Sequence, residues 1–183
     1  MARRRLTGVL LVGGASTRFG SPKALAALEG ETLAGRAWRV LGEACEERIA
    51  VGKCGDDLRL PFQVLDDGTE VRAALAGVVA GLRAAREQIA VFLPVDVPLA
   101  TPTLLRELGD VCDEAAVTST GPLPAALARD ALPALERRLA ERRLRLADVF
   151  AELRTTTVEA DPAELVNVNR PEDLAEIRRR LAG

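Results

Sequence analysis

The stretch LLVGGASTRFGSPKAL, from Leu10 to Leu25, sets the organisation of this chain. Its apolar start leads directly into a glycine-rich segment that carries Arg18 and Lys23. Glycine lacks a Cβ atom and adopts positive φ readily, so Gly13 and Gly14 allow several backbone N–H groups to approach one anion. The arginine and the lysine supply the positive charge that a polyphosphate requires. The stretch therefore predicts a β-strand followed by a phosphate-binding loop.

Two familiar glycine loops do not fit this stretch. A P-loop requires G-x-x-x-x-G-K-[ST], but the glycines here have another spacing, and Ala24 follows Lys23 where a hydroxyl would bind magnesium. A dinucleotide-binding fingerprint requires G-x-G-x-x-G at the start of a helix, whereas the two adjacent glycines break that spacing and Pro22 interrupts any helix. The alternative to a phosphate loop is a plain glycine-rich connection between a strand and a helix.

Length and composition predict one globular domain over residues 1–183. Hydrophobic residues make up 48% and charged residues 28%, which is typical of a folded domain and not of disorder. The formal net charge is −2, and aromatic residues make up only 3%. Without a basic bias or stacking platforms, nucleic acid is not an expected partner.

Cysteine and histidine usage narrows the possible chemistry. The three cysteines lie far apart, which argues against disulfides and structural zinc and suits a reducing cytosol. Histidine is absent, which excludes Ser-His-Asp and Cys-His mechanisms and leaves carboxylates, amides, cations and a hard metal ion. No apolar run is long enough to span a membrane, and no signal peptide is recognisable, so we expect a soluble cytoplasmic protein without membrane partners.

Hydrophobic periodicity predicts an α/β fold with a doubly wound, mostly parallel sheet. Strands are expected at residues 9–12, 48–52, 62–65, 88–93, 115–118, 123–128, 155–158 and 165–168. Helices are expected at residues 32–47, 73–86, 101–111, 130–140 and 144–153, and from Pro171 onward. In the region from 130 to 153, the side chains of Arg137, Arg138, Arg142 and Arg143 are expected mostly on a solvated face.

Polar residues follow several of these strands. In a doubly wound sheet, ligands bind beyond the carboxyl ends of the strands, so the glycine loop, Asp66–Asp67, Asp96 and Asn167–Asn169 should gather at one edge. Asp96 follows the most hydrophobic strand and lies between two prolines. Its carboxylate is placed to bind Mg²⁺ beside triphosphate oxygens, although a turn or capping aspartate explains the same position equally well.

Three motifs carry a resemblance to a known family. The pattern L-x-G-G-x-S-x-R-x-G-x-x-K, at 11–23, resembles the signature loop of nucleotidyltransferases that condense a nucleoside triphosphate with a phosphorylated acceptor. LPVDVPL at 93–99 and NVNRPEDL at 167–174 are similar to later motifs of these enzymes. Within them, the chain most resembles the molybdenum cofactor guanylyltransferases. The resemblance implies a nucleotide-diphospho-sugar transferase (Rossmann-like) fold.

The resemblance also implies roles for individual residues. The residues it places at the nucleotide are Leu11, Gly13, Gly14, Arg18, Lys23, Asp67 and Asp96. Of these, Arg18, Lys23 and Asp96 would act in catalysis, and Asp66 matches the motif as well as Asp67 does. The resemblance implies that Asp96 and Asn169 bind Mg²⁺. Glu172 and Asp173 fit the first turn of a helix better than they fit the role of metal ligands.

The implied reaction is the Mg²⁺-dependent transfer of GMP from GTP to molybdopterin, which releases pyrophosphate. The alternatives are a cytidylyltransferase of the same cofactor, a sugar-phosphate nucleotidyltransferase and, in another class, a non-catalytic nucleotide-binding protein. Two departures from the family pattern, Pro22 and residues 72–77, flank the expected nucleotide site. Transient contacts with molybdoenzymes or other cofactor-biosynthesis proteins are further expected partners.

Overall fold

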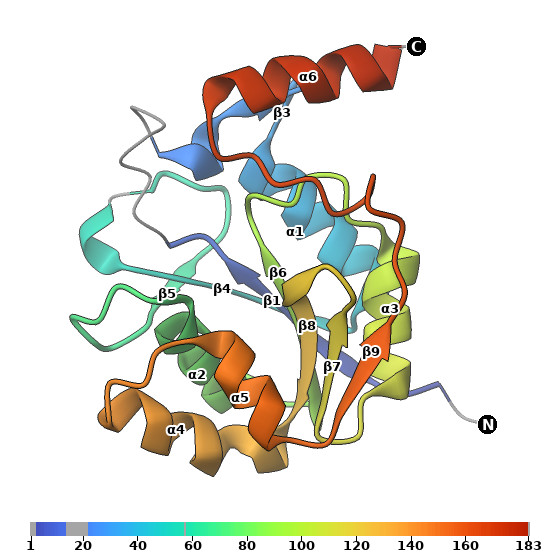
Figure 1. The fold of residues 1–183 in the computed structure, drawn as a ribbon. Coiled ribbons are helices and arrows are strands. Elements are labelled where there is room, and N and C mark those ends of the chain that lie inside the picture. Colours follow the sequence, from blue (N-terminus) through green and yellow to red (C-terminus); the bar gives the residue numbers. More distant parts are fainter. Residues whose placement is uncertain (1–2, 14–21, 57, 183) are drawn as a thin grey trace.

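The computed structural model describes residues 3–13, 22–56 and 58–182, which form a seven-stranded sheet covered by helices (Figure 1). The sheet order is β5-β4-β1-β6-β8-β7-β9. These strands are β1 (Leu6–Leu11), β4 (Glu47–Gly52), β5 (Val64–Asp66), β6 (Ile89–Pro94), β7 (Ala115–Thr118), β8 (Gly121–Ala128) and β9 (Thr155–Val158). Only β8 pairs antiparallel with its neighbours, so the prediction of a mostly parallel α/β sheet is confirmed.

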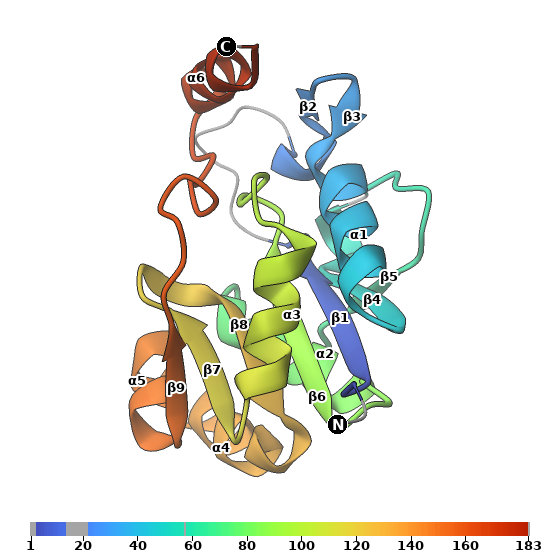
Figure 2. The same ribbon diagram turned by 90° about the vertical axis from the view of Figure 1, so that its right-hand side faces the viewer.

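Helices cover both faces of the sheet (Figures 1 and 2). They are α1 (Leu33–Ala44), α2 (Ala74–Ala84), α3 (Pro102–Val111), α4 (Leu132–Ala140), α5 (Leu146–Glu152) and α6 (Pro171–Ala182). Buried side chains of α1 and α3 form one core with the sheet, and those of α2, α4 and α5 form a second core on the opposite face. Among the helices in the described residues, none has the length and apolar character needed to cross a membrane.

Two glycines bring α2 against the central strands. A Cβ atom on Gly81 would lie 2.5 Å from Cγ1 of Val9, and one on Gly77 would lie 3.1 Å from Cδ2 of Leu11. Any larger residue at position 81 would therefore push α2 away from β1. This close approach places the N-terminal half of α2 beside the end of β1.

Local capping explains where the helices begin. Thr101 caps α3 by accepting a hydrogen bond from the backbone N–H of Leu104 at 3.2 Å, and Pro102 occupies the first turn. Thr32 caps α1 in the same way through Gly35 N–H at 3.0 Å. The helix expected to reach Glu47 ends at Ala44, because the chain turns there into β4.

Three features differ from the sequence-based expectations. Residues 165–168 form no strand, although Leu165 and Val168 are buried. The β-propensity of this segment is not sufficient for it to pair with a strand of the sheet. A short antiparallel pair, β2 (Ala27–Leu28) and β3 (Glu31–Thr32), was not expected. Arg138 does not lie on a solvated face: its side chain is 1% exposed and pairs with Glu152 and Asp148 of α5.

Candidate active site

A cavity of about 570 Å³ opens at the carboxyl ends of the parallel strands β1, β4, β5 and β6. This is the edge at which a doubly wound sheet binds its ligands. The lining residues come from the strand ends, the start of α2, the β7–β8 turn and the segment before α6. They are Leu11, Val12, Gly13, Lys23, Val51, Gly52, Lys53, Asp67, Arg72, Ala73, Ala74, Gly77, Pro94, Val95, Asp96, Thr120, Gly121, Pro122, Leu123, Leu165 and Asn167.

Most of the predicted site residues lie together in this cavity. Leu11, Gly13, Lys23, Asp67 and Asp96 all line it, although they come from segments far apart in the sequence. The predicted residues Gly14 and Arg18 lie outside the described residues.

Lys23 and Asp96 form an ion pair within the cavity. The Nζ atom of Lys23 lies 3.2 Å from Oδ2 of Asp96, and the two side chains are 15% and 27% exposed. Lys23 begins a short 3-10 helix that ends at Leu25, whereas Asp96 follows the central strand β6. The Val95 N–H bonds to the carbonyl of Leu11 at 3.1 Å, which ties the two strand ends together. The pair offers an ammonium group for phosphate oxygens and a carboxylate for a cation.

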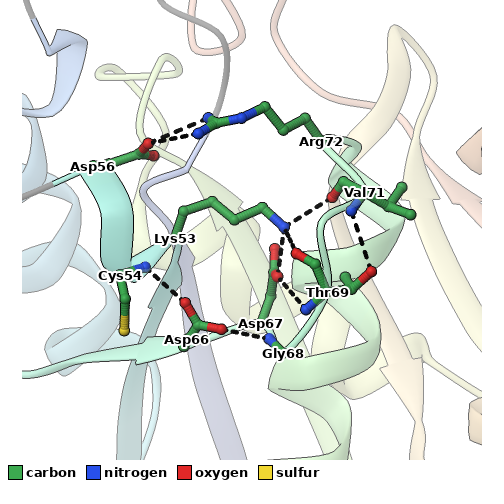
Figure 3. A network of polar contacts seen from close by, with 9 residues as sticks. All are labelled: Lys53, Cys54, Asp56, Asp66, Asp67, Gly68, Thr69, Val71 and Arg72. Carbon is green, nitrogen blue, oxygen red and sulfur yellow. Dashed lines mark hydrogen bonds and ion pairs between the residues drawn. The ribbon is translucent and has the colours of Figure 1, made fainter.

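Asp66 and Asp67 have different surroundings, shown in Figure 3. Asp66 accepts backbone hydrogen bonds from Cys54 and Gly68, both at 2.7 Å, and these hydrogen bonds lower the pKa of its carboxyl group. Asp67 instead lines the cavity, and its side chain is 6% exposed. Its Oδ1 atom lies 2.6 Å from Nζ of Lys53. The structure thus separates two carboxylates that the sequence left as alternatives.

The two asparagines of the C-terminal motif also differ. The N–H of Val168 bonds to the carbonyl of Asp96 at 2.8 Å, and this contact holds the motif beside the end of β6. Both side chains are exposed, but Asn167 lines the cavity and Asn169 is not among the residues that line it. The side-chain nitrogen of Asn167 donates to the carbonyl of Leu165 at 3.4 Å, which leaves its side-chain oxygen to accept or coordinate.

Asp173 caps the last helix. Its Oδ2 atom accepts hydrogen bonds from the backbone N–H groups of Asn169 and Arg170 at 2.7 and 2.8 Å. These two hydrogen bonds lower the pKa of Asp173. The expectation that Asp173 is a first-turn residue of a helix is confirmed.

One known protein family matches most of this chain. Residues 8–156 match the family described as the MobA-like NTP transferase domain. The chain belongs to this family. It is therefore a nucleotidyltransferase, and its matched region includes Lys23, Asp67 and Asp96 but ends before Asn167.

Full-length relatives of this MobA-like chain are known. A protein from Opitutus terrae named "Probable molybdenum cofactor guanylyltransferase" is 36% identical over 97% of this chain and 96% of its own length. A protein of the same name from Deinococcus radiodurans is 35% identical over 96% of this chain and 95% of its own length. The crystal structure of molybdopterin-guanine dinucleotide biosynthesis protein A from Archaeoglobus fulgidus superposes with a TM-score of 0.82, at 20% identity, and covers 96% of this chain and 98% of that one. This last likeness shows the shared fold, which is that of the nucleotide-diphospho-sugar transferases.

The MobA-like site includes residues that sequence reasoning missed. Lys53 lines the cavity, as do Thr120 in the β7–β8 turn and the first residues of β8, 121–123. Arg72, from the segment expected to flank the site, lines it as well. Lys53 directly follows β4, and the strand-end rule that selected Asp96 applies to it equally. The chain also has only two lysines, Lys23 and Lys53, whereas all its other cationic side chains are arginines. The rarity of lysine in the sequence therefore marked Lys53, like Lys23, as a candidate site residue.

Two oxygen-bearing side chains in the cavity of this MobA-like domain are of the kind that Mg²⁺ prefers. Among the described residues, no three His, Cys, Asp or Glu side chains cluster as a metal site. Mg²⁺ does not require such a cluster, because one or two protein oxygen ligands usually hold it together with substrate phosphates and water. Asp96 and the side-chain oxygen of Asn167 offer two such ligands in one cavity. The role predicted for Asn169 stays a prediction.

Proposed function

We propose that this chain transfers GMP from GTP to molybdopterin, and that the reaction depends on Mg²⁺ and takes place in the cytoplasm. The observation that carries the proposal is the Lys23–Asp96 pair, set 3.2 Å apart in a cavity at the carboxyl ends of the sheet. The acceptor is inferred from the full-length relatives, whose names specify molybdenum cofactor guanylyltransferases.

The cavity residues suit a transfer that needs no protein base. A phosphate monoester has its second pKa near 6, so a phosphorylated acceptor is largely a dianion at pH 7. An oxygen of this monoester attacks the α-phosphorus of GTP; a new P–O bond forms as the bond to pyrophosphate breaks, and pyrophosphate leaves. Catalysis then consists of positioning and neutralisation of charge. The lack of histidine in the chain is compatible with this chemistry.

Each group of the site has a task in this scheme. Lys23 donates to oxygens of the triphosphate, and the backbone at Gly13 brings N–H groups close to it. Asp96, with the side-chain oxygen of Asn167, would hold Mg²⁺, which when bound offsets the negative charge of the phosphates. Asp67, which directly follows β5, lines the same cavity, and in this scheme its carboxylate accepts hydrogen bonds from the base.

Isothermal titration with GTP, CTP, ATP and UTP, each with and without MgCl₂, tests the donor assignment. We expect GTP with Mg²⁺ to bind at least about tenfold more tightly than the other nucleotides, because a site built to pair with specific base donors penalises bases that lack them. A preference for CTP would replace guanylyl transfer by cytidylyl transfer. Failure to bind any of the four would favour a non-catalytic protein.

A further inference from the structure

Lys53 uses its whole hydrogen-bonding capacity inside the protein. Its Nζ atom donates to Oδ1 of Asp67 at 2.6 Å, to the carbonyl of Val71 at 2.9 Å and to the carbonyl of Thr69 (Figure 3). An ammonium group carries three N–H donors, so all of them are engaged. The side chain is 13% exposed. Although Lys53 lines the cavity, it has no donor left for a ligand.

Lys23 is different in this respect. Within the described part of the chain, its ammonium group makes one hydrogen bond, to Asp96. Two of its three donors therefore have no partner among residues 3–13, 22–56 and 58–182 and can serve a ligand. The two lysines of the chain face the same cavity, yet only Lys23 is equipped to bind phosphate.

The carboxylate of Asp67 is held at one oxygen only. Oδ1 accepts from Lys53 and, at 3.2 Å, from the backbone N–H of Thr69. Across the described residues, Oδ2 has no hydrogen-bond partner, while the side chain lines the cavity. An acceptor fixed in this way suits the edge of guanine, which carries an N1–H and a 2-amino donor, whereas adenine has neither.

We propose that Lys53 is a positioning residue for base selection. It clamps Asp67 and the carbonyls of residues 69 and 71 in one arrangement, so that Oδ2 of Asp67 faces the donor edge of the base, and it does not itself contact the nucleotide. The inference rests on the proposed function, because it takes GTP as the donor.

Asp66 provides a matched control. Its carboxylate ties the same two chain segments together, through Cys54 N–H and Gly68 N–H, but it is exposed and does not line the cavity. Asp66→Asn weakens this tie without changing Asp67. A general loosening of the turn would therefore affect nucleotide selection in this variant as well, whereas a specific role of Lys53 would not.

The test uses isothermal titration of the full chain and of Lys53→Met, Lys23→Met and Asp66→Asn with GTP, ATP and inorganic tripolyphosphate. For Lys53→Met, we expect the GTP-to-ATP affinity ratio to fall by about tenfold or more, as for the loss of a hydrogen bond to a charged group, while tripolyphosphate affinity changes less than about twofold. Lys23→Met should lose tripolyphosphate affinity and keep the base ratio. Asp66→Asn should keep both.

The outcomes that overturn the proposal are distinct. An unchanged base ratio in Lys53→Met would remove the role of Lys53 and leave the guanylyltransferase assignment intact. If Lys53→Met loses as much tripolyphosphate affinity as Lys23→Met, Lys53 binds phosphate. If the GTP-to-ATP affinity ratio falls equally in Asp66→Asn, the effect comes from general loosening of the turn. A wild-type chain without GTP preference would overturn both assignments. If Lys53→Met does not fold by circular dichroism, Lys53→Gln replaces it with the same expected direction.

Discussion

Lys23 and Asp96 lie 73 positions apart in the chain, and their side chains meet at 3.2 Å in the cavity at the carboxyl end of the sheet. Asp96 follows β6, Lys23 comes after β1 in the chain, and these two strands pair in parallel. The ion pair therefore joins segments that follow two neighbouring strands of the sheet. In the proposed reaction Lys23 donates hydrogen bonds to the triphosphate, and Asp96 would hold the metal ion.

Replacement of Asp96 should stop turnover without unfolding the chain. Asp96→Ala removes the carboxylate of the proposed metal site and the partner of Lys23, and we expect the rate of GMP transfer to fall by at least about 10²-fold, as when one transition-state-stabilising group is lost. The measurement is initial rate at saturating MgCl₂, with far-UV circular dichroism as the check on folding. Near-full activity in a folded variant would remove Asp96 as a metal ligand.

Replacement of Lys23 should weaken nucleotide binding. Lys23→Ala loses charge-assisted hydrogen bonds to the triphosphate, which corresponds to a loss of about 1.5–3 kcal/mol in the binding free energy of GTP. Titration calorimetry measures this loss directly. An unchanged Kd would show that the phosphates bind elsewhere in the cavity.

Substitution of Asp67 should change which base is bound. Asp67→Asn replaces one carboxylate oxygen, an acceptor, by an N–H donor. Xanthine has a carbonyl where guanine has its 2-amino group, so the new donor can bond to xanthine and not to guanine at this position. We expect GTP affinity to fall by about tenfold or more and XTP to bind more tightly than GTP. Competition between the two nucleotides in one titration gives the ratio. Retained GTP preference would mean that Asp67 does not contact the base.

The class of the sheet and the edge at which the site was expected followed from local sequence signals. Apolar runs that end in glycine or carboxylate predicted the strand ends, and parallel pairing brought Gly13, Asp67 and Asp96 to one edge. Thr101 and Pro102 predicted the start of α3, because a cap and a first-turn proline act within one helical turn. Signals of this kind need no knowledge of tertiary contacts.

The missed features depend on contacts between distant segments. The position of Lys53 after β4 could be read from the sequence, but no local pattern reveals that the carbonyls of residues 69 and 71 converge on its ammonium group. Residues 165–168 are β-prone, but neighbouring segments decide whether a strand pairs. Arg138 looked like one of several surface arginines, and only the packing of α4 against α5 buries it.

Arg138 offers a test of that packing. Its side chain is 1% exposed, and its buried Nε has no hydrogen-bond partner in the part of the chain that the structure describes. Its carboxylate partners Glu152 and Asp148 are themselves partly exposed. Arg138→Met keeps most of the buried volume, so we expect the free energy of unfolding to change by less than about 1 kcal/mol. Arg138→Ala leaves a cavity and should cost about 2–3 kcal/mol. Urea unfolding compares the two, and equal losses would show that the ion pairs dominate.

The cysteines predict a dependence of stability on high pH. Burial raises the pKa of the Cys45 and Cys112 thiols from about 9 to about 12. Above about pH 9 the thiols lose their protons in the unfolded state but keep them in the folded state, which favours unfolding. The free energy of unfolding should therefore be independent of these thiols below pH 9 and should fall as the pH rises from 9 toward 12. Urea unfolding at several pH values, with Cys45→Ala/Cys112→Ala as the control, measures this effect. An equal pH dependence in the control would assign it to other groups.

Formation of the guanine dinucleotide tests the central claim most directly. Purified protein is incubated with molybdopterin, MgCl₂ and GTP labelled at the α-phosphate, with Asp96→Ala as the inactive control. We predict that the label appears in a molybdopterin guanine dinucleotide, with one pyrophosphate released for each molecule formed, and that CTP and ATP give little product. If the wild-type chain binds GTP and yet forms no dinucleotide, or forms one only from another nucleotide, the proposed guanylyl transfer is contradicted.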